Sequence, residues 1–114
     1  MDCIEIERFE NLKEDPKFLS RVFTDREINY CKSNGKPSQH FAARFAGKEA
    51  VIKALSSFDV RIEFLQIEIR NDKDGKPFVN LLAPNTKKFL AKISMSHSET
   101  VAIAFVIICE HSRI

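Results

Sequence analysis

The segment FAARFAGKEAVIKAL, residues 41–55, decides how the rest of this chain can fold. Its apolar side chains recur at helical spacing, so we expect one long helix from about Ser38 to Leu55. The alanines and the glycine within it leave room for a second backbone or a ligand to come close. The same helix carries a carboxylate among cations: Glu49, Arg44, Lys48 and Lys53. This combination suits a metal ion together with a phosphate-bearing ligand.

The composition fits a single globular domain over residues 1–114, with 44% hydrophobic and 30% charged residues. The net charge of +2 provides no overall field for nucleic acid, so we expect no nucleic-acid partner. The three cysteines lie far apart and form no CxxC pair, which is typical of a reducing compartment. We find no signal peptide, and the longest apolar run, residues 101–109, is too short to cross a membrane as a helix. We therefore expect a cytoplasmic protein without a membrane partner.

The rest of the chain predicts short helices first and antiparallel strands later. Asp15-Pro16 and the capping box of Thr24 and Glu27 each open a short helix. Alternating patterns predict strands over residues 2–7, 62–70, 78–82, 93–96 and 101–109, a hairpin turn at 71–77 and a short helix at 84–91. The class is α+β, an antiparallel sheet packed on a long helix, with short helices near the N-terminus. The last strand is apolar on both faces, so helices of the chain or another subunit should cover both.

Asp2 and Glu49 form the first candidate site. Asp2 shares its strand parity with Ile4 and Ile6, so its carboxylate lies on the core-facing side and needs a partner there. One acid at a strand end and one within a helix would supply the carboxylates that Mg²⁺ takes beside water and phosphate oxygens. The alternative is two unrelated acids, each capping a helix or paired with a cation, and spacing alone favours it.

The cations and the histidine allow two interpretations as well. Lys53 lies one helical turn after Glu49, a pair that is common on solvated surfaces. Arg44 and Lys48 are also one turn apart, and a site that tolerates this repulsion could bind an anion, although a solvated face explains it too. His97, in SMSHSET, ends a strand and is either structural or ligand-binding. The chain contains no glycine-rich phosphate loop.

Basic residues of the first helices form the last candidate surface. Three phenylalanines, Phe9, Phe18 and Phe23, are interleaved with the cations Arg8, Lys17 and Arg21. Lys17 and Arg21 are one helical turn apart. A cationic rim with aromatic anchors suits an acidic helix of a partner protein. The alternative is a solvated helix whose phenylalanines point into the core.

These segments together resemble the holo-acyl-carrier-protein synthases, the short bacterial-type 4'-phosphopantetheinyl transferases. DCIEIERF resembles their opening D-I-x-E-I-x-R strand, RVFTDREI their F-T-x-x-E segment, and FAARFAGKEAVIKAL their F-A-x-R-F-A-x-K-E-A-x-x-K-A signature. IEIRNDKDGKPFV resembles their strand–turn–strand, and ISMSHSETVAIA their S-x-S-H segment. The motifs follow in the family's order over nearly the whole chain, which implies the 4'-phosphopantetheinyl transferase-like fold. One departure is that Ser56 and Ser57 replace a usual glycine, and serine disfavours a positive φ.

The resemblance implies a reaction and its participants. The 4'-phosphopantetheine arm of coenzyme A would move to a serine of apo acyl carrier protein of fatty-acid or polyketide synthesis, with Mg²⁺ as cofactor and adenosine 3',5'-bisphosphate as product. By motif match, Asp2 and Glu49 would bind the metal, Glu49 would be the candidate base, and Lys53 would contact the pyrophosphate.

The remaining positions are assigned in the same way. Arg44, Lys48 and His97 would lie along the nucleotide end of coenzyme A. Arg8, Lys17 and Arg21 match positions that dock the acidic helix of the carrier. Family members of this length are commonly homotrimers, with each active site at a subunit boundary. The other hypothesis is a catalytically weak binding module that holds an acidic carrier protein through the same basic face.

Overall fold

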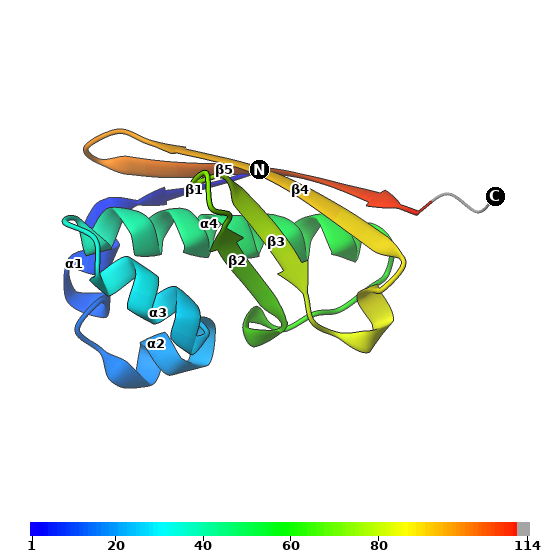
Figure 1. Ribbon diagram of the computed structural model, residues 1–114, viewed down its shortest axis with the longest axis horizontal. Coiled ribbons are helices and arrows are strands. Elements are labelled where there is room, and N and C mark those ends of the chain that lie inside the picture. The colour runs from blue at the N-terminus through cyan, green and yellow to red at the C-terminus, as the bar shows by residue number, and fades with distance from the viewer. Residues whose placement is uncertain (112–114) are drawn as a thin grey trace.

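A long central helix, α4 (Pro37–Ser56), organises the computed structural model, which describes residues 1–111 (Figure 1). A three-stranded sheet lies along one side of α4, and the short helices α2 (Pro16–Val22) and α3 (Asp25–Lys32) lie on the other (Figure 1). A two-stranded hairpin crosses α4 beside them. The α+β class and the long helix predicted from the sequence are confirmed. None of the helices in residues 1–111 combines the length and the apolar character needed to cross a membrane.

The larger sheet is antiparallel and has the order β1–β5–β4. Its strands are β1 (Asp2–Glu5), β5 (Val101–Glu110) and β4 (Phe89–His97). Asp2 pairs with Ala104, and His97 pairs with Ala102. Both alanines are fully buried under α4, and paired residues point to the same face. Asp2 and His97 therefore both point to the α4 side of the sheet, but from its two opposite edge strands.

Small residues let α4 pack closely on all sides. Ala42, Ala46 and Ala50 are at most 1% exposed. A Cβ atom added to Gly47 would lie 2.7 Å from Cδ1 of Ile69 and 2.9 Å from Cδ1 of Ile93. Glycine is needed at this position because two isoleucine side chains meet the helix backbone there.

The first helices surround a cluster of phenylalanine rings. The 3₁₀ turn η1 (Ile6–Arg8) leads into α1 (Phe9–Leu12), followed by α2 (Pro16–Val22) and α3 (Asp25–Lys32). Phe9 and Phe23 are at most 1% exposed, and each lies against Phe41 of α4. These two rings belong to the core and cannot anchor a partner, whereas Phe18 is half-buried and packs against Phe9 and Phe45.

Local signals at the helix ends are also confirmed. The Asp15 side chain accepts a hydrogen bond from the Phe18 N–H at 3.2 Å, and Thr24 and Glu27 form the reciprocal capping box. At the end of α4 neither Ser56 nor Ser57 has a positive φ; the left-handed residue is Asp59, with φ of 59°. The replacement of glycine by serine therefore causes no strain at these two positions.

Three sequence predictions differ from the structure. The strand predicted over residues 2–7 ends early, because residues 6–8 form η1. The strand predicted over 62–70 starts late, because the 3₁₀ turn η2 (Phe64–Gln66) precedes β2 (Ile67–Asn71). The hairpin returns as β3 (Pro77–Leu81). The helix expected over 84–91 is wrong: only η3 (Pro84–Thr86) is helical, and β4 begins at Phe89. Pairing of Phe89 with Glu110 of β5 overrides the local helix signal there.

We predict that Gly47→Val lowers the free energy of unfolding by about 1–3 kcal/mol, because the side chain must displace Ile69 and Ile93. Gly35→Val is the matched control, since a Cβ atom at Gly35 meets nothing within 4 Å. Urea denaturation followed by circular dichroism measures both. Equal stability of the two variants would contradict the close packing at Gly47.

Candidate functional site

Two carboxylates lie together where β1 passes α4. Oδ1 of Asp2 accepts a hydrogen bond from Nζ of Lys53 at 2.8 Å. Oδ2 of Asp2 is buried and has no hydrogen-bond partner among residues 1–111. Burial raises the pKa of Glu49, and the negative charge of Asp2 raises it further, while Lys53 and Arg8 act in the opposite direction. The two predicted acids therefore lie close enough for their charges to interact, and one buried oxygen of Asp2 is available to a ligand.

Lys53 and Arg8 complete this charged group. The Lys53 side chain is 61% exposed, and its hydrogen bond to Asp2 raises the pKa of the ammonium. Arg8 extends from η1 over the ring of Phe45, with its guanidinium carbon 5.7 Å from the ring centroid. A half-buried acidic pair is therefore flanked by two cations that solvent and a substrate can reach. We call Asp2, Glu49, Lys53 and Arg8 the acidic-pair site.

The donor set of this site fits a hard divalent cation. Within residues 1–111, no three side chains of Asp, Glu, His or Cys gather closely enough to enclose a metal ion. Two carboxylates with a free buried oxygen match Mg²⁺, which usually keeps several waters or phosphate oxygens in its shell.

A second group of polar residues lies around Arg44. The Arg44 side chain is 2% exposed, and its guanidinium carbon lies 4.3 Å from the ring centroid of Tyr30. Nη2 of Arg44 donates a hydrogen bond to Oδ1 of Asn71, at the end of β2. Its Nε is buried, without a hydrogen-bond partner in the described part of the chain. A buried cation with a free donor is suited to receiving an anion.

Two hollows adjoin Arg44. One, of about 200 Å³, is lined by Tyr30, His40, Asn71 and His97 among others. The other, of about 350 Å³, is lined by the further cations Arg26, Arg70 and Lys73. We call Arg44 and these two hollows the Arg44 site. It contains Arg44 and His97, as the sequence predicted.

Sequence reasoning missed three residues of the Arg44 site. Tyr30 and His40 come from α3 and α4, with ring centroids 5.6 Å apart, and Asn71 comes from β2. Burial lowers the pKa of His40, and the charges of Arg44 and His97 lower it further. The sequence pattern predicts Asn71 within a hairpin turn, where a ligand-binding role is not indicated. For Tyr30 the sequence offers one signal, that it is the single tyrosine of the chain.

Lys48 belongs to neither site, which corrects its predicted place along a nucleotide. Its side chain is fully buried, and Nζ lies 2.6 Å from Oε1 of Glu27. Nζ also donates to the carbonyl oxygens of Val22 at 2.7 Å and Phe64 at 3.0 Å. All three ammonium protons therefore have partners inside the protein, and the ammonium is shielded from solvent.

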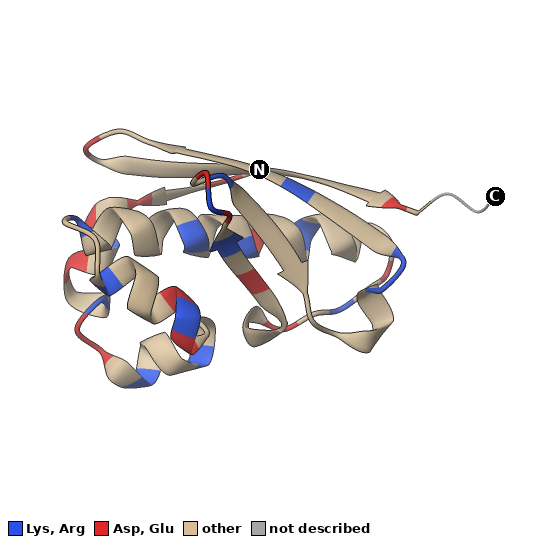
Figure 2. Ribbon diagram, viewed as in Figure 1, with Lys and Arg blue, Asp and Glu red and all other residues tan. Residues whose placement is uncertain are grey.

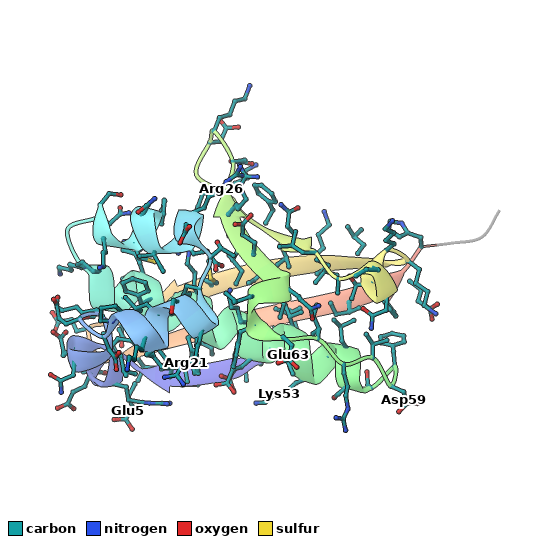
Figure 3. All side chains as sticks on the ribbon, turned by 90° about the horizontal axis from the view of Figure 1, so that it is seen from below. Glu5, Arg21, Arg26, Lys53, Asp59 and Glu63 are labelled. Atoms are coloured by element: carbon teal, nitrogen blue, oxygen red, sulfur yellow. The ribbon has the colours of Figure 1, made fainter. Side chains whose placement is uncertain are left out.

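One chain does not bring the two sites together. Glu49 follows Arg44 by five residues, which rotates its side chain by roughly 140° around the helix axis. Asp2 and His97 lie on opposite edge strands of the sheet. Figure 3 shows Lys53 of the acidic-pair site and Arg26 of the Arg44 site on opposite edges of the molecule.

Two of the predicted docking residues lie on the same short helix. Lys17 and Arg21 are exposed on α2, the helix farthest from the sheet (Figure 2). Nε of Arg21 donates to the Lys17 carbonyl oxygen at 3.2 Å. Arg21 and Lys53 lie along the same edge of the molecule (Figure 3). These cations are therefore available to a partner, and Phe18 beside them is half-buried.

Comparison with known proteins identifies the family. The family model described as the 4'-phosphopantetheinyl transferase superfamily matches residues 1–106. The chain belongs to this superfamily. Within it, a holo-[acyl-carrier-protein] synthase of Thermodesulfovibrio yellowstonii is 44% identical over 110 residues, which cover 95% of the chain and 94% of that relative. The corresponding protein of Protochlamydia amoebophila is 45% identical over 112 residues, with 93% and 92% covered.

Solved structures of the superfamily agree with this fold. A holo-(acyl-carrier-protein) synthase of Bacillus anthracis, in complex with CoA (3',5'-ADP), is 35% identical with a TM-score of 0.78, covering 97% of this chain and 93% of that one. The Helicobacter pylori enzyme in complex with coenzyme A is 32% identical with a TM-score of 0.81, covering 95% and 96%. The fold expected from the motifs is confirmed.

We predict that Glu49→Gln stabilises the metal-free protein at neutral pH. The raised pKa means that ionisation of Glu49 costs stability as the pH rises through that pKa, and glutamine removes the cost. The gain should be largest near pH 7 and smallest below about pH 4, where glutamate is protonated in the unfolded chain as well. Urea denaturation in EDTA at several pH values measures it.

An Asp2→Asn background provides the control for that experiment. In that background the pH-dependent gain in the free energy of unfolding from Glu49→Gln should be smaller. The reason is that asparagine removes the negative charge of Asp2, one of the two causes of the raised Glu49 pKa. A gain with the same pH dependence in the Asp2→Asn background as in the wild type would mean that the two carboxylates do not interact.

Proposed function

We propose that this protein transfers the 4'-phosphopantetheine arm of coenzyme A to a serine of apo acyl carrier protein and releases adenosine 3',5'-bisphosphate. The observation that carries the proposal is the acidic-pair site, in which Asp2, Glu49 and Lys53 converge from β1 and α4. Curated relatives covering over nine-tenths of the chain are holo-[acyl-carrier-protein] synthases. Related structures contain coenzyme A or its 3',5'-ADP portion.

The acidic-pair site supplies the groups that this transfer requires. The serine hydroxyl oxygen attacks the phosphorus that bears the pantetheine arm, and the bond from that phosphorus to the oxygen bridging it to the nucleotide phosphate breaks. Asp2 and Glu49 would hold Mg²⁺, which when bound neutralises charge on the pyrophosphate. Lys53 would add a mobile point charge to a phosphate oxygen.

Glu49 is also the candidate acceptor of the serine proton. Its carboxylate lies beside Asp2 and Lys53, where the serine of a docked carrier would meet the phosphate. The proton then leaves the hydroxyl as the new bond to phosphorus forms, and the negative charge departs with adenosine 3',5'-bisphosphate.

The Arg44 site would receive the nucleotide end of the coenzyme. Its buried guanidinium has a free Nε and lies among further cations, and this arrangement suits phosphate groups. Because the two sites lie on opposite edges of one chain, a coenzyme that contacts both must bridge two copies. We therefore propose that the protein acts as a homotrimer, with each active site at a subunit boundary.

An apolar face supports such an assembly. On the side of the sheet away from α4, Leu90, Phe105 and Ile107 are 46–52% exposed. Large apolar side chains that lie together on a sheet face are typical of a surface that a partner covers. A second copy of the chain would bury these side chains. Both faces of β5 would then be covered, one by α4 and the other by the second copy.

The basic rim of Arg8, Lys17 and Arg21 would meet the acidic carrier protein. All three side chains are exposed, and Arg21 lies along the same edge of the molecule as Lys53 (Figure 3), so a docked carrier would have its serine near the acidic-pair site. We place the reaction in the cytoplasm, which agrees with the three free cysteines of residues 1–111.

The direct test is to incubate the protein with apo acyl carrier protein, coenzyme A and Mg²⁺ and to weigh the carrier by mass spectrometry. We expect the wild type to add the mass of the arm and Glu49→Gln to add none, because the amide can neither bind the metal as a carboxylate nor accept the proton. Glu14→Gln, an exposed substitution outside both sites, serves as the control. A carrier that binds without gaining mass indicates the binding module, and normal turnover by Glu49→Gln excludes the acidic-pair site.

The shared site can be tested by complementation. The variants Glu49→Gln and Arg44→Met should each be inactive when expressed alone. When the two are co-expressed, some subunit boundaries of the mixed trimers contain an intact Glu49 from one chain and an intact Arg44 from the other. Random mixing makes about a quarter of boundaries intact, so about a quarter of wild-type activity per chain should return. If each chain held a complete active site, the activity of the mixture would equal only the sum of the activities of the two variants.

A further inference from the structure

A buried ion pair connects three parts of the molecule. Nζ of Lys48, on α4, lies 2.6 Å from Oε1 of Glu27, on α3, and both side chains are fully buried. The other two protons of the ammonium bind the carbonyl oxygens of Val22, at the end of α2, and Phe64, in η2. Burial lowers the pKa of Lys48, while the carboxylates of Glu27 and Glu68 oppose that shift.

Glu27 makes the matching set of contacts. Its Oε1 also accepts a hydrogen bond from the Thr24 N–H at 2.9 Å, and its Oε2 accepts one from the Ile69 N–H of β2 at 2.8 Å. The Thr24 hydroxyl donates to Oε2 of Glu68, also on β2, at 2.7 Å. The pair therefore bonds directly to the backbone on both sides of the α2–α3 connection, to η2 and to β2.

Each of these elements carries a different part of the proposed active site. Lys48 precedes Glu49 directly on α4. Val22 ends the helix that presents Lys17 and Arg21, and Ile69 lies two residues before Asn71, which binds Arg44. A single buried pair thus sets the distances from the basic rim and the hairpin to the proposed base.

We propose that Glu27 and Lys48 are positioning residues for the transfer reaction, which hold the carrier-docking helix α2 in register with Glu49. This inference rests on the proposed function. The geometry also explains why ionic groups are needed here. Two backbone N–H groups and two backbone carbonyl groups point into the same buried space. The Glu27 carboxylate accepts from both N–H groups, and the Lys48 ammonium donates to both carbonyl oxygens, so the pair satisfies all four.

The test is steady-state kinetics of Glu27→Gln and Lys48→Met with purified apo carrier, coenzyme A and Mg²⁺. Both variants keep nearly the original shape but break the pair. We expect kcat per folded enzyme to fall about tenfold or more, since a displacement of about 1 Å is enough to misalign reacting groups. KM for the carrier should stay within about threefold, because the exposed rim itself is intact.

Two controls separate positioning from stability. Phe89→Leu, in the core of β4 and outside the network, should lower the denaturation midpoint and leave kcat per folded enzyme unchanged. Arg21→Ala should raise KM for the carrier with little change in kcat, because it removes a rim charge. Circular dichroism gives the folded fraction of every variant, and having two variants of the pair keeps the test valid if one fails to fold.

The outcomes are distinct. If the wild type is active and Glu27→Gln or Lys48→Met retains its kcat, or raises KM alone, the positioning role is wrong and the proposed function stands. If the loss of kcat equals that of Phe89→Leu at matched stability, the pair is only structural. A wild type that leaves the carrier unmodified overturns the proposed function and this inference with it.

Discussion

The close approach of other backbones to α4 is the constraint on which the rest of the structure depends. Ala42, Ala46 and Gly47 have little or no side chain, so the sheet and the β2–β3 hairpin can pack against the helix at short distance. Over residues 41–48, where every residue is buried, the helix has no solvated face of its own. Its charged residues must therefore lie in the gaps between neighbouring elements, where each meets a particular partner.

This constraint gives charges of one helix different environments. Lys53 emerges beside β1 and stays exposed, Arg44 enters the gap beside Asn71, and Lys48 is enclosed under α3. Removing one member of a buried ion pair typically costs about 3–5 kcal/mol, whereas an exposed pair contributes less than about 1 kcal/mol. The Lys48–Glu27 pair thus matters to the fold in a way that the Lys53–Asp2 pair does not, and Lys53 is free to move to a ligand.

Much of the fold was predictable because its signals are local. The capping box at Thr24, the Asp15–Pro16 helix start and the 71–77 turn each depend on a few consecutive residues. The errors occur where a distant segment decides. Residues 87–91 could form a helix by themselves, but they pair with β5 because Phe89 and Ala91 then become buried. Residues 62–66 leave the strand where η2 meets the ammonium of Lys48.

The sequence by itself determined the family, the long helix and the residues that carry charge, because motif order and helical periodicity are properties of the linear chain. It could not distinguish Lys48 from Lys53, since spacing along a helix does not reveal what covers each face. Only the tertiary structure showed that Lys48 is buried, and that Tyr30, His40 and Asn71 gather around Arg44. It also decided that the two sites lie apart on one chain, because the position of Asp2 and His97 on opposite edges follows from strand order, which no local pattern contains.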